Sequence, residues 1–403
     1  MQEKKEAGAE SKFKFEIKLK QHTPMIHFQH AQTGASLRAT ELKPKLDKFL
    51  KKKCPYLPFG EKGNLDYKVK IITSNIEFKD ITPPKQDENG NIKTNSKGEI
   101  QREAYPNFFG NIGSNNGNYK KTSFTRSIIN LEFFSFEKEI KKAIKENFTE
   151  FILKTNFGTR QSKGFGSFYI HPDEENYKKP NLKYKFTVDS TKIKELFYKI
   201  ELFYKTLRSG INRVNFKSKT TIFYFKSMMF LYAKHIGIQW DKKSIKEAYF
   251  TKGLTAQNVK HKKPEKNKKL MKDLLGLSAT ESWKSYNETI KKEHKNKEID
   301  RFKSPIIFKP LLNKNNGFDV YFYAKKINPD FLGQCFVIKN NSRNDLKLQV
   351  PEKFDFDEFL AFALKVDLYS HVENVDTNFH STKEFKSIKV IYDDINKNLR
   401  GAK

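Results

Sequence analysis

A glycine-rich segment at residues 157–167, Phe-Gly-Thr-Arg-Gln-Ser-Lys-Gly-Phe-Gly-Ser, carries the strongest chemical signal in the sequence. Its glycines and cations are Gly158, Gly164, Gly166, Arg160 and Lys163. Glycines let a backbone approach a phosphate chain closely, and cations between them neutralise it. The Gly-Lys-Ser/Thr ending of a nucleotide P-loop is missing. We therefore expect contact with a nucleic-acid backbone, with Phe165 stacked on a base or packed inward. The alternative is an ordinary turn between a helix and a strand.

A second basic segment, Leu-Arg-Ser-Gly-Ile-Asn-Arg at residues 207–213, follows the expected end of a helix. Arginine forks suit phosphate recognition, so Arg208 and Arg213 are candidate nucleic-acid contacts. A cation at a helix C-terminus also complements the helix dipole. The sequence leaves both interpretations open.

Three histidines, His22, His27 and His30, lie close together in the sequence. Histidine can act as a general acid or base, or bind a metal. No carboxylate stands at metal-binding spacing beside them, and Cys54 and Cys335 are too far apart in the sequence for a zinc motif. We expect polar surface or a nucleic-acid contact, chiefly through His27. The prediction is no catalytic residue, no metal and no cofactor.

The charge balance points to a polyanionic partner. The chain has 78 Lys and Arg against 47 Asp and Glu, a net charge of +31 over 403 residues. Such an excess attracts nucleic acid with a strong dependence on salt, although a lysine-rich composition could supply part of it. No apolar run approaches the roughly 18 residues of a membrane span. A cytoplasmic protein without a membrane partner is expected.

The elements that would position the glycine-rich segment follow from the periodicity of residues 11–185. Alternation from Phe13 to Leu19 predicts a strand, and apolar spacings of three and four predict a helix capped by Thr40. Further strands are expected over 65–71, 123–134 and 164–170, and a second helix over 137–154. The order strand, helix, strand, strand, helix, strand is the ferredoxin-like arrangement of RNA-recognition modules. Residues 80–120 are expected to form a long loop.

The second domain, over residues 186–403, is predicted to be helical first and then mixed. We expect helices from Asp189 or Ser190 to Gly210, over 221–235 and, as the last one, over 354–365. Strands are expected over 304–311, 318–325 and 334–339, and a basic loop over 258–272. The fold class is α+β, with this half a divergent second ferredoxin-like region carrying a helical insertion.

The glycine-rich segment resembles the signature loop of the RAMP superfamily. It is most similar to the version in the first RAMP subunit, at the head of the type III-B (Cmr) CRISPR effector complex. The residues that fit are Gly158, Arg160, Ser162, Lys163, Gly164, Phe165, Gly166 and Ser167. Residues 23–26 and 37–44 are similar to two earlier family segments. By this resemblance Arg38, Thr40 and Lys43 would face the RNA backbone.

The resemblance implies a non-catalytic RNA-binding subunit of a ribonucleoprotein for antiviral RNA-guided defence. Its expected partners are CRISPR RNA, near its 3′ end, target RNA and the other RAMP subunits. One alternative is an endoribonuclease on the same fold that processes CRISPR RNA. Another is the other head subunit, but that subunit carries its glycine-rich loop near the C-terminus, where this chain has only Gly401 in its last 60 residues.

Overall fold

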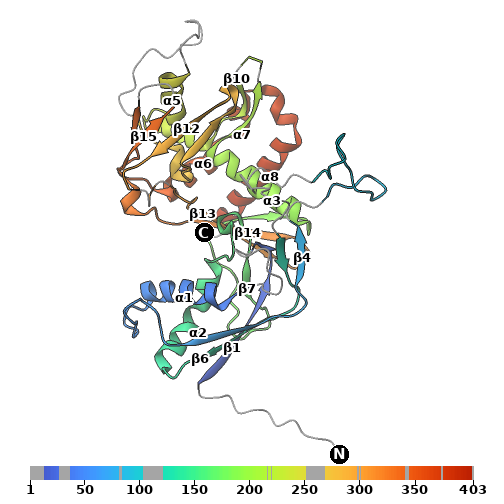
Figure 1. Cartoon of the computed structure of the whole chain (residues 1–403), viewed down its shortest axis with the longest axis vertical. Helices are drawn as coiled ribbons and strands as arrows, with labels where there is room; N and C mark the ends of the chain where they lie inside the picture. The colour runs from blue at the N-terminus through green and yellow to red at the C-terminus, as the bar shows by residue number, and fades with distance from the viewer. Residues whose placement is uncertain are drawn as a thin grey trace, which may run out of the picture. The chain divides into compact units, whose positions relative to one another are not determined.

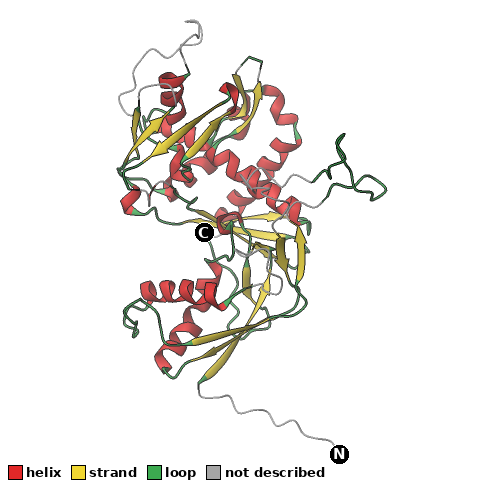
Figure 2. Cartoon of the chain, viewed as in Figure 1, coloured by secondary structure: helices red, strands yellow, loops and turns green. Residues whose placement is uncertain are grey.

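The computed structural model describes most of the chain in two compact units. The described residues are 13–26, 37–80, 84–102, 121–215, 217–218, 220–250, 268–296, 299, 301–340, 345–373 and 375–401. Unit 1 comprises residues 1–182, 189–197 and 308–321, and unit 2 comprises 183–188, 198–307 and 322–403. Figure 1 follows the chain by colour, and Figure 2 shows that both units mix helices and strands. His27, His30 and most of the predicted basic loop lie outside the described residues.

Unit 1 contains the predicted ferredoxin-like arrangement. Its six elements in chain order are β1 (Lys14–Gln21), α1 (Ala39–Lys53), β3 (Lys68–Ile72), β6 (Ile129–Phe134), α2 (Lys138–Leu153) and β7 (Phe168–Ile170). The sheet order is β3-β6-β1-β7, so the four strands run second, third, first, fourth across the sheet. All three pairings are antiparallel. This strand order is the one expected for the βαββαβ motif.

Strand alternation places an apolar face of this sheet against the two helices. Phe15, Ile17 and Leu19 of β1 are buried, whereas Lys14, Glu16 and Lys18 are exposed. The helices contribute apolar residues at spacings of three and four, including Leu42, Leu46 and Leu50 of α1 and Ile140, Ile144, Phe148 and Phe151 of α2. Both helices lie to one side of β1 and β6 (Figure 1). One face of the sheet is therefore core, and the other is open.

The predicted strand over 123–134 is two strands in the structure. β5 (Lys121–Phe124) ends before β6 and joins a second sheet, ordered β2-β5-β4, with β2 (Met25–Ile26) and β4 (Glu77–Asp80). The buried Gln21 side chain stabilises the chain where β5 ends. It donates to the Ser123 carbonyl and accepts from the Thr125 N–H, each at 3.0 Å. A side-chain contact across a hundred residues is invisible to local periodicity.

The segment predicted as a long loop is regular where it is described. Residues 84–102 contain two turns spaced eight residues apart, one at Asp87 and one at Asn95. Each side chain accepts from backbone N–H groups two and four residues later, and Gly90 and Gly98 occupy the left-handed positions. Asp and Asn stabilise turns in this way. Residues 84–102 contain turns and isolated bridges but no helix or strand, so the long loop expected over 80–120 is not contradicted in this described stretch.

The second half repeats part of the same topology. β8 (Tyr184–Val188), α3 (Ile193–Arg208), β13 (Ile306–Leu312), β14 (Phe318–Ala324) and α8 (Lys383–Gly401) follow in the order strand, helix, strand, strand, helix. The sheet order β13-β14-β8 is again second, third, first. α8 packs along β8, and Asp394 accepts from the Thr187 N–H at 2.5 Å. This is the ferredoxin-like order with no fourth strand among the described residues, which agrees with the predicted divergent copy.

Two insertions complete the second half. The first holds β9 (Ile211–Asn215), β10 (Thr220–Phe225), α4 (Met228–His235), α5 (Asp241–Tyr249), η5 (Lys272–Leu275), β11 (Thr280–Trp283), η6 (Lys284–Tyr286) and β12 (Glu288–Glu293). The second holds η8 (Pro329–Phe331), β15 (Cys335–Lys339), β16 (Leu346–Gln349), α6 (Phe356–Lys365), α7 (Leu368–Glu373) and η9 (Thr377–Ser381). Strands from both insertions form the sheet β11-β12-β15-β16.

Two sequence predictions for this half were wrong. The predicted helix over 221–235 is strand β10 followed by α4, because β10 pairs with β9 and Ser227 caps a new helix by accepting from the Phe230 N–H. The helix over 354–365 is α6 and is not the last one. α8 follows it, with a buried stripe of Phe385, Ile388, Ile391, Tyr392 and Ile395.

Candidate nucleic-acid interface

The glycine-rich loop connects α2 to β7 and packs tightly on the chain after β1. Its Gly158, Gly164 and Gly166 have φ angles of +77°, +88° and +62°. A Cβ on Gly166 would stand 2.0 Å from the Phe157 carbonyl oxygen, and one on Gly158 would stand 2.4 Å from the Ile26 carbonyl oxygen. The backbone conformation and the close approach thus both require glycine at these two positions.

Residues 23–26, Thr-Pro-Met-Ile, are one of the two earlier segments with family similarity, and this Thr-Pro segment holds the loop. The Thr23 hydroxyl donates to the Gly164 carbonyl at 2.6 Å and accepts from the Ser167 N–H at 2.9 Å. The Gly166 N–H donates to the Pro24 carbonyl at 2.9 Å. Two motifs more than 130 residues apart therefore form one structural unit.

The first turn of α1 also holds the loop, through residues that the sequence analysis did not select. The Glu41 carboxylate accepts from the Gly158 N–H at 2.8 Å and from the Lys45 ammonium at 2.7 Å. Lys45 also donates to the Asn156 carbonyl at 3.1 Å. The available signal was an acid in the first turn of a helix, with a lysine four residues later.

A buried lysine and a buried asparagine donate hydrogen bonds to backbone carbonyls in and beside the loop. The Lys309 ammonium donates to the carbonyls of Thr155 and Phe168, each at 2.7 Å, and burial holds its pKa well below the ordinary value. The Asn156 amide donates to the carbonyls of Gln161 and Phe308, each at 2.7 Å. The loop conformation is therefore fixed from both ends, and nothing in the local sequence around Lys309 indicates this role.

The loop carries its two cations on this fixed backbone. Arg160 adopts a left-handed conformation, with φ +58°, at the start of a short 3-10 turn, η3 (Gln161–Lys163). Arg160, Ser162 and Lys163 are half-buried. Burial lowers the pKa of the Arg160 guanidinium to about 10, which leaves it charged at neutral pH. The loop can thus offer fixed positive charge beside a hydroxyl to an anionic ligand.

Phe165 packs inward. Its side chain is fully buried, and its ring stacks on Phe197 with centroids 3.8 Å apart and an interplanar angle of 1°. Of the two predicted roles for Phe165, inward packing is the one that the structure has. A base cannot stack on this ring without opening the core.

The three predicted residues at the start of α1 have different environments. Arg38 is the half-buried N-cap residue, and Thr40 is exposed in the first turn rather than at the cap. The Lys43 ammonium pairs with Asp47 at 3.0 Å, donates to the Leu65 carbonyl at 2.7 Å and lies 3.8 Å from the centroid of the Tyr67 ring. Its charge is engaged within unit 1, so a contact with RNA through Lys43 remains only a prediction.

His22 is buried, in contrast to the polar surface expected for the histidine group. Its Nδ1 accepts from the Leu312 N–H at 2.8 Å, so the neutral ring supports a backbone amide. Burial, reinforced by the nearby Lys309 and Lys20, holds its pKa well below the ordinary value. A buried neutral imidazole engaged in this way cannot serve as general base for a substrate at the surface.

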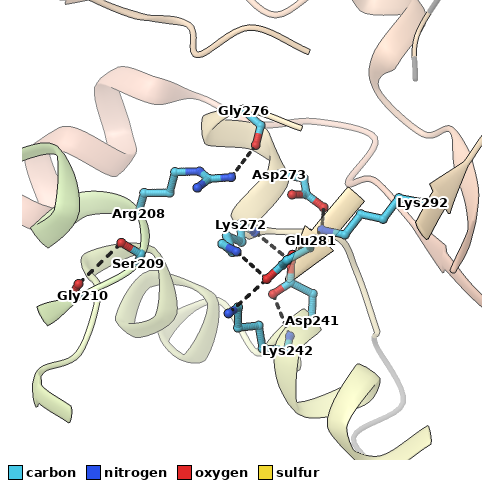
Figure 3. A network of polar contacts seen from close by, with 10 residues as sticks. All are labelled: Arg208, Ser209, Gly210, Asp241, Lys242, Lys272, Asp273, Gly276, Glu281 and Lys292. Atoms are coloured by element: carbon cyan, nitrogen blue, oxygen red, sulfur yellow. Dashed lines mark hydrogen bonds and ion pairs between the residues drawn. The ribbon is translucent and has the colours of Figure 1, made fainter. Parts of the chain in front are cut away.

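Unit 2 contains the second candidate segment. Arg208 ends α3 and donates to the Gly276 carbonyl at 2.7 Å, beside a buried charge network (Figure 3). Arg213 is exposed on β9. Arg208 therefore makes a contact within unit 2 that neither open interpretation anticipated, and Arg213 remains a candidate surface cation.

The buried charge network joins four elements of unit 2. The Lys292 ammonium pairs with Asp273 at 2.6 Å and Glu281 at 2.8 Å, and Lys272 pairs with Glu281 at 2.7 Å. Asp241 at the start of α5 accepts from the Lys272 N–H at 3.1 Å. Burial lowers the pKa of the Lys272 ammonium to about 7, and neighbouring lysines hold the pKa of Glu281 well below its ordinary value. The network ties α5, η5, β11 and β12 together.

Over the described part of the chain, no group of three or more His, Cys, Asp or Glu side chains is placed to hold a metal ion. No described helix is long and apolar enough to cross a membrane.

Comparisons with known proteins find family similarity over most of the chain. The family model for the Cmr1 N-terminal domain matches residues 12–211, and the model for the Cmr1 C-terminal domain matches residues 224–390. A chain of a cryo-EM structure of type III-B Cmr-beta bound to cognate target RNA is similar at 12% identity and a TM-score of 0.27. The similarity covers 40% of this chain and 58% of that one. A search of curated proteins finds no match. Because the two family matches together span most of its length, the chain belongs to the Cmr1 family, a RAMP family of type III-B CRISPR effectors.

Proposed function

We propose that this chain is a non-catalytic RNA-binding subunit of a type III-B CRISPR ribonucleoprotein. It binds CRISPR RNA near its 3′ end, target RNA, or both, and assembles with other RAMP subunits. RNA is held by shape and backbone charge more than by base sequence.

One observation carries the proposal. The glycine-rich loop is locked by Thr23, Glu41 and Lys309, so Arg160 and Lys163 start from fixed positions. A binding site whose backbone is already ordered loses less entropy when its ligand binds. In a chain with a net charge of +31, such a loop is suited to a phosphate backbone.

The first prediction tests the loop cations. Arg160→Asn combined with Lys163→Ala should weaken binding of single-stranded RNA and reduce the salt slope by about 0.7 per lost phosphate contact. Asparagine suits the left-handed conformation of position 160, so the loop should keep its shape. Binding is measured by fluorescence anisotropy from 50 to 200 mM salt.

The matched control removes two charges elsewhere in unit 1. Lys138 and Lys142 are exposed on α2, and changing both to alanine lowers the net charge equally. If both double variants weaken binding to the same extent, the loop has no special role. If the loop variant binds as wild type does, the loop is only a turn.

The second prediction concerns the endoribonuclease alternative. We expect the purified chain to leave guide and target RNA uncut without metal, because His22 is buried and accepts from a backbone amide. Products would be resolved on denaturing gels. Cleavage that disappears in His22→Ala, His27→Ala or His30→Ala would establish an endoribonuclease instead.

A further inference from the structure

The face of the unit 1 sheet that α1 and α2 leave uncovered has a regular arrangement of side chains. Across β1, β6 and β3, Lys14 is paired with Phe134, and Phe134 is paired with Lys68. Directly opposed residues on antiparallel strands point to the same face, with Cβ atoms about 5 Å apart. A half-buried phenylalanine therefore stands in the open face between two exposed lysines.

Two more aromatic rings adjoin Phe134 at the end of the sheet where β1 begins and β6 ends. The Phe136 ring is 4.9 Å from Phe134 and 5.3 Å from Phe13, centroid to centroid, with both contacts edge-to-face. Phe136 is 67% exposed and Phe13 is 36% exposed, although alternation had predicted Phe13 to be in the core. Three partly solvated phenylalanines at one place need a reason beyond the stability of this unit.

The charges on this face are mainly positive. Its exposed lysines are Lys14, Lys18, Lys68 and Lys70, and its glutamates are Glu16 and Glu132. Lys70 pairs with Glu132 at 3.8 Å, and Lys18 pairs with Glu174 at 3.6 Å. Within the described residues, Lys14 and Lys68, which flank Phe134, have no ion-pair partner.

We propose that this open sheet face binds single-stranded RNA. Phe134 and Phe136 stack on unpaired bases, and Lys14 and Lys68 contact the adjoining phosphates. Every base has a π face, so stacking on aromatic rings is tolerant of sequence, and flanking lysines follow the backbone. The inference rests on the proposed function for its RNA partner, but it concerns a surface other than the glycine-rich loop.

The composition of the face favours RNA over a protein partner. Buried centres of protein interfaces are depleted in lysine, because each lysine must lose its hydration. Surfaces that bind single strands combine lysines with aromatic rings, as this face does. A double helix fits poorly, because its stacked bases are not available to protruding phenylalanine rings.

The test uses the full chain and a 15-nucleotide single-stranded RNA that carries 2-aminopurine, whose fluorescence reports stacking. Phe136→Ala with Phe134→Leu should bind about tenfold more weakly and lose the fluorescence change. Tyr56→Ala is the matched control, because Tyr56 is a 70% exposed aromatic residue in the turn after α1. Lys14→Ala with Lys68→Ala should lower the salt slope more than Lys138→Ala with Lys142→Ala.

The outcomes separate this inference from the proposed function. If the phenylalanine variant matches wild type while the Arg160 and Lys163 variant is weak, the sheet face does not bind RNA and the proposed function stands. If the phenylalanine variant alone is weak, the RNA site is the sheet face and the loop proposal fails. If the wild-type chain binds no single-stranded RNA at low salt, both fail. Equal competition by a duplex of the same sequence would also overturn base stacking.

Discussion

Gly166 illustrates how closely single residues control the candidate interface. It adopts a left-handed conformation while its α-carbon packs against the backbone at Phe157. The loop can turn back onto the Thr-Pro segment only because no side chain is present there. The positions of Arg160 and Lys163 thus depend on a residue that has no functional group of its own.

Gly166→Ala is expected to destabilise unit 1 by roughly 3 kcal/mol or more, because the new Cβ would lie 2.0 Å from the Phe157 carbonyl oxygen. Gly63→Ala is the matched control in the same unit. Gly63 also has a positive φ, +73°, but its added Cβ would meet only the flexible end of the Lys51 side chain. That substitution should cost about 1–2 kcal/mol, the cost of the left-handed backbone alone. If urea unfolding gives the same loss of unfolding free energy for both variants, the close approach at Gly166 does not contribute to stability.

At the scale of secondary-structure elements, buried charged side chains join α5, η5, β11 and β12 in addition to the apolar core of these elements. The network holds η5, β11 and β12 through lysine–carboxylate pairs. It joins α5 through Asp241, which accepts from the Lys272 backbone N–H. Removing one member of a buried pair leaves its partner unpaired in a poorly solvated site, which costs far more than a surface pair contributes. We therefore expect the stability of this part of unit 2 to depend on pH.

Asp241 provides the test of that sensitivity. Burial, with the nearby Asp273, raises its pKa from 3.8 to about 6. A carboxyl group whose pKa rises on folding contributes stability below about pH 4, and this contribution is lost as the pH rises through about 6. The loss corresponds to roughly 3 kcal/mol. We expect Asp241→Asn to gain up to that amount over wild type between pH 4 and pH 7.

The measurement is urea unfolding followed by tryptophan fluorescence. Trp240 and Trp283, the only tryptophans in the sequence, both belong to unit 2. Asp330→Asn serves as the control, because Asp330 is exposed in the same unit. A constant stability difference between Asp241→Asn and wild type across this pH range would show that Asp241 does not titrate in it.

At the scale of the whole molecule, the excess of 31 positive charges dominates the behaviour expected toward RNA. Affinity for single-stranded RNA should fall steeply between 50 and 200 mM salt, with a slope of about 0.7 per neutralised phosphate. The dependence should be nearly the same for RNAs of unrelated sequence. Anisotropy titrations at several salt concentrations measure it, and a flat response would contradict binding through the phosphate backbone.

The sequence alone determined the class of the fold and the location of the main motif. Strict alternation in β1 and the apolar stripes of α1 and α2 predicted the βαββαβ order, because each pattern is local and one face of each element is buried. The glycines of residues 157–167 predicted a backbone conformation that other residues rarely adopt, and the net charge predicted a polyanionic partner. These properties need no knowledge of distant contacts.

Only the tertiary structure decided what each side chain does. Phe165 was compatible with base stacking until its ring was found stacked on Phe197. Lys43 pairs with Asp47 and donates to the Leu65 carbonyl, contacts that the sequence did not indicate, and its contact with RNA stays a prediction. Glu41 and Lys309 support the loop from positions 117 or more residues away in the sequence. Such contacts depend on which distant segments pack together, and a local stretch of sequence does not determine this.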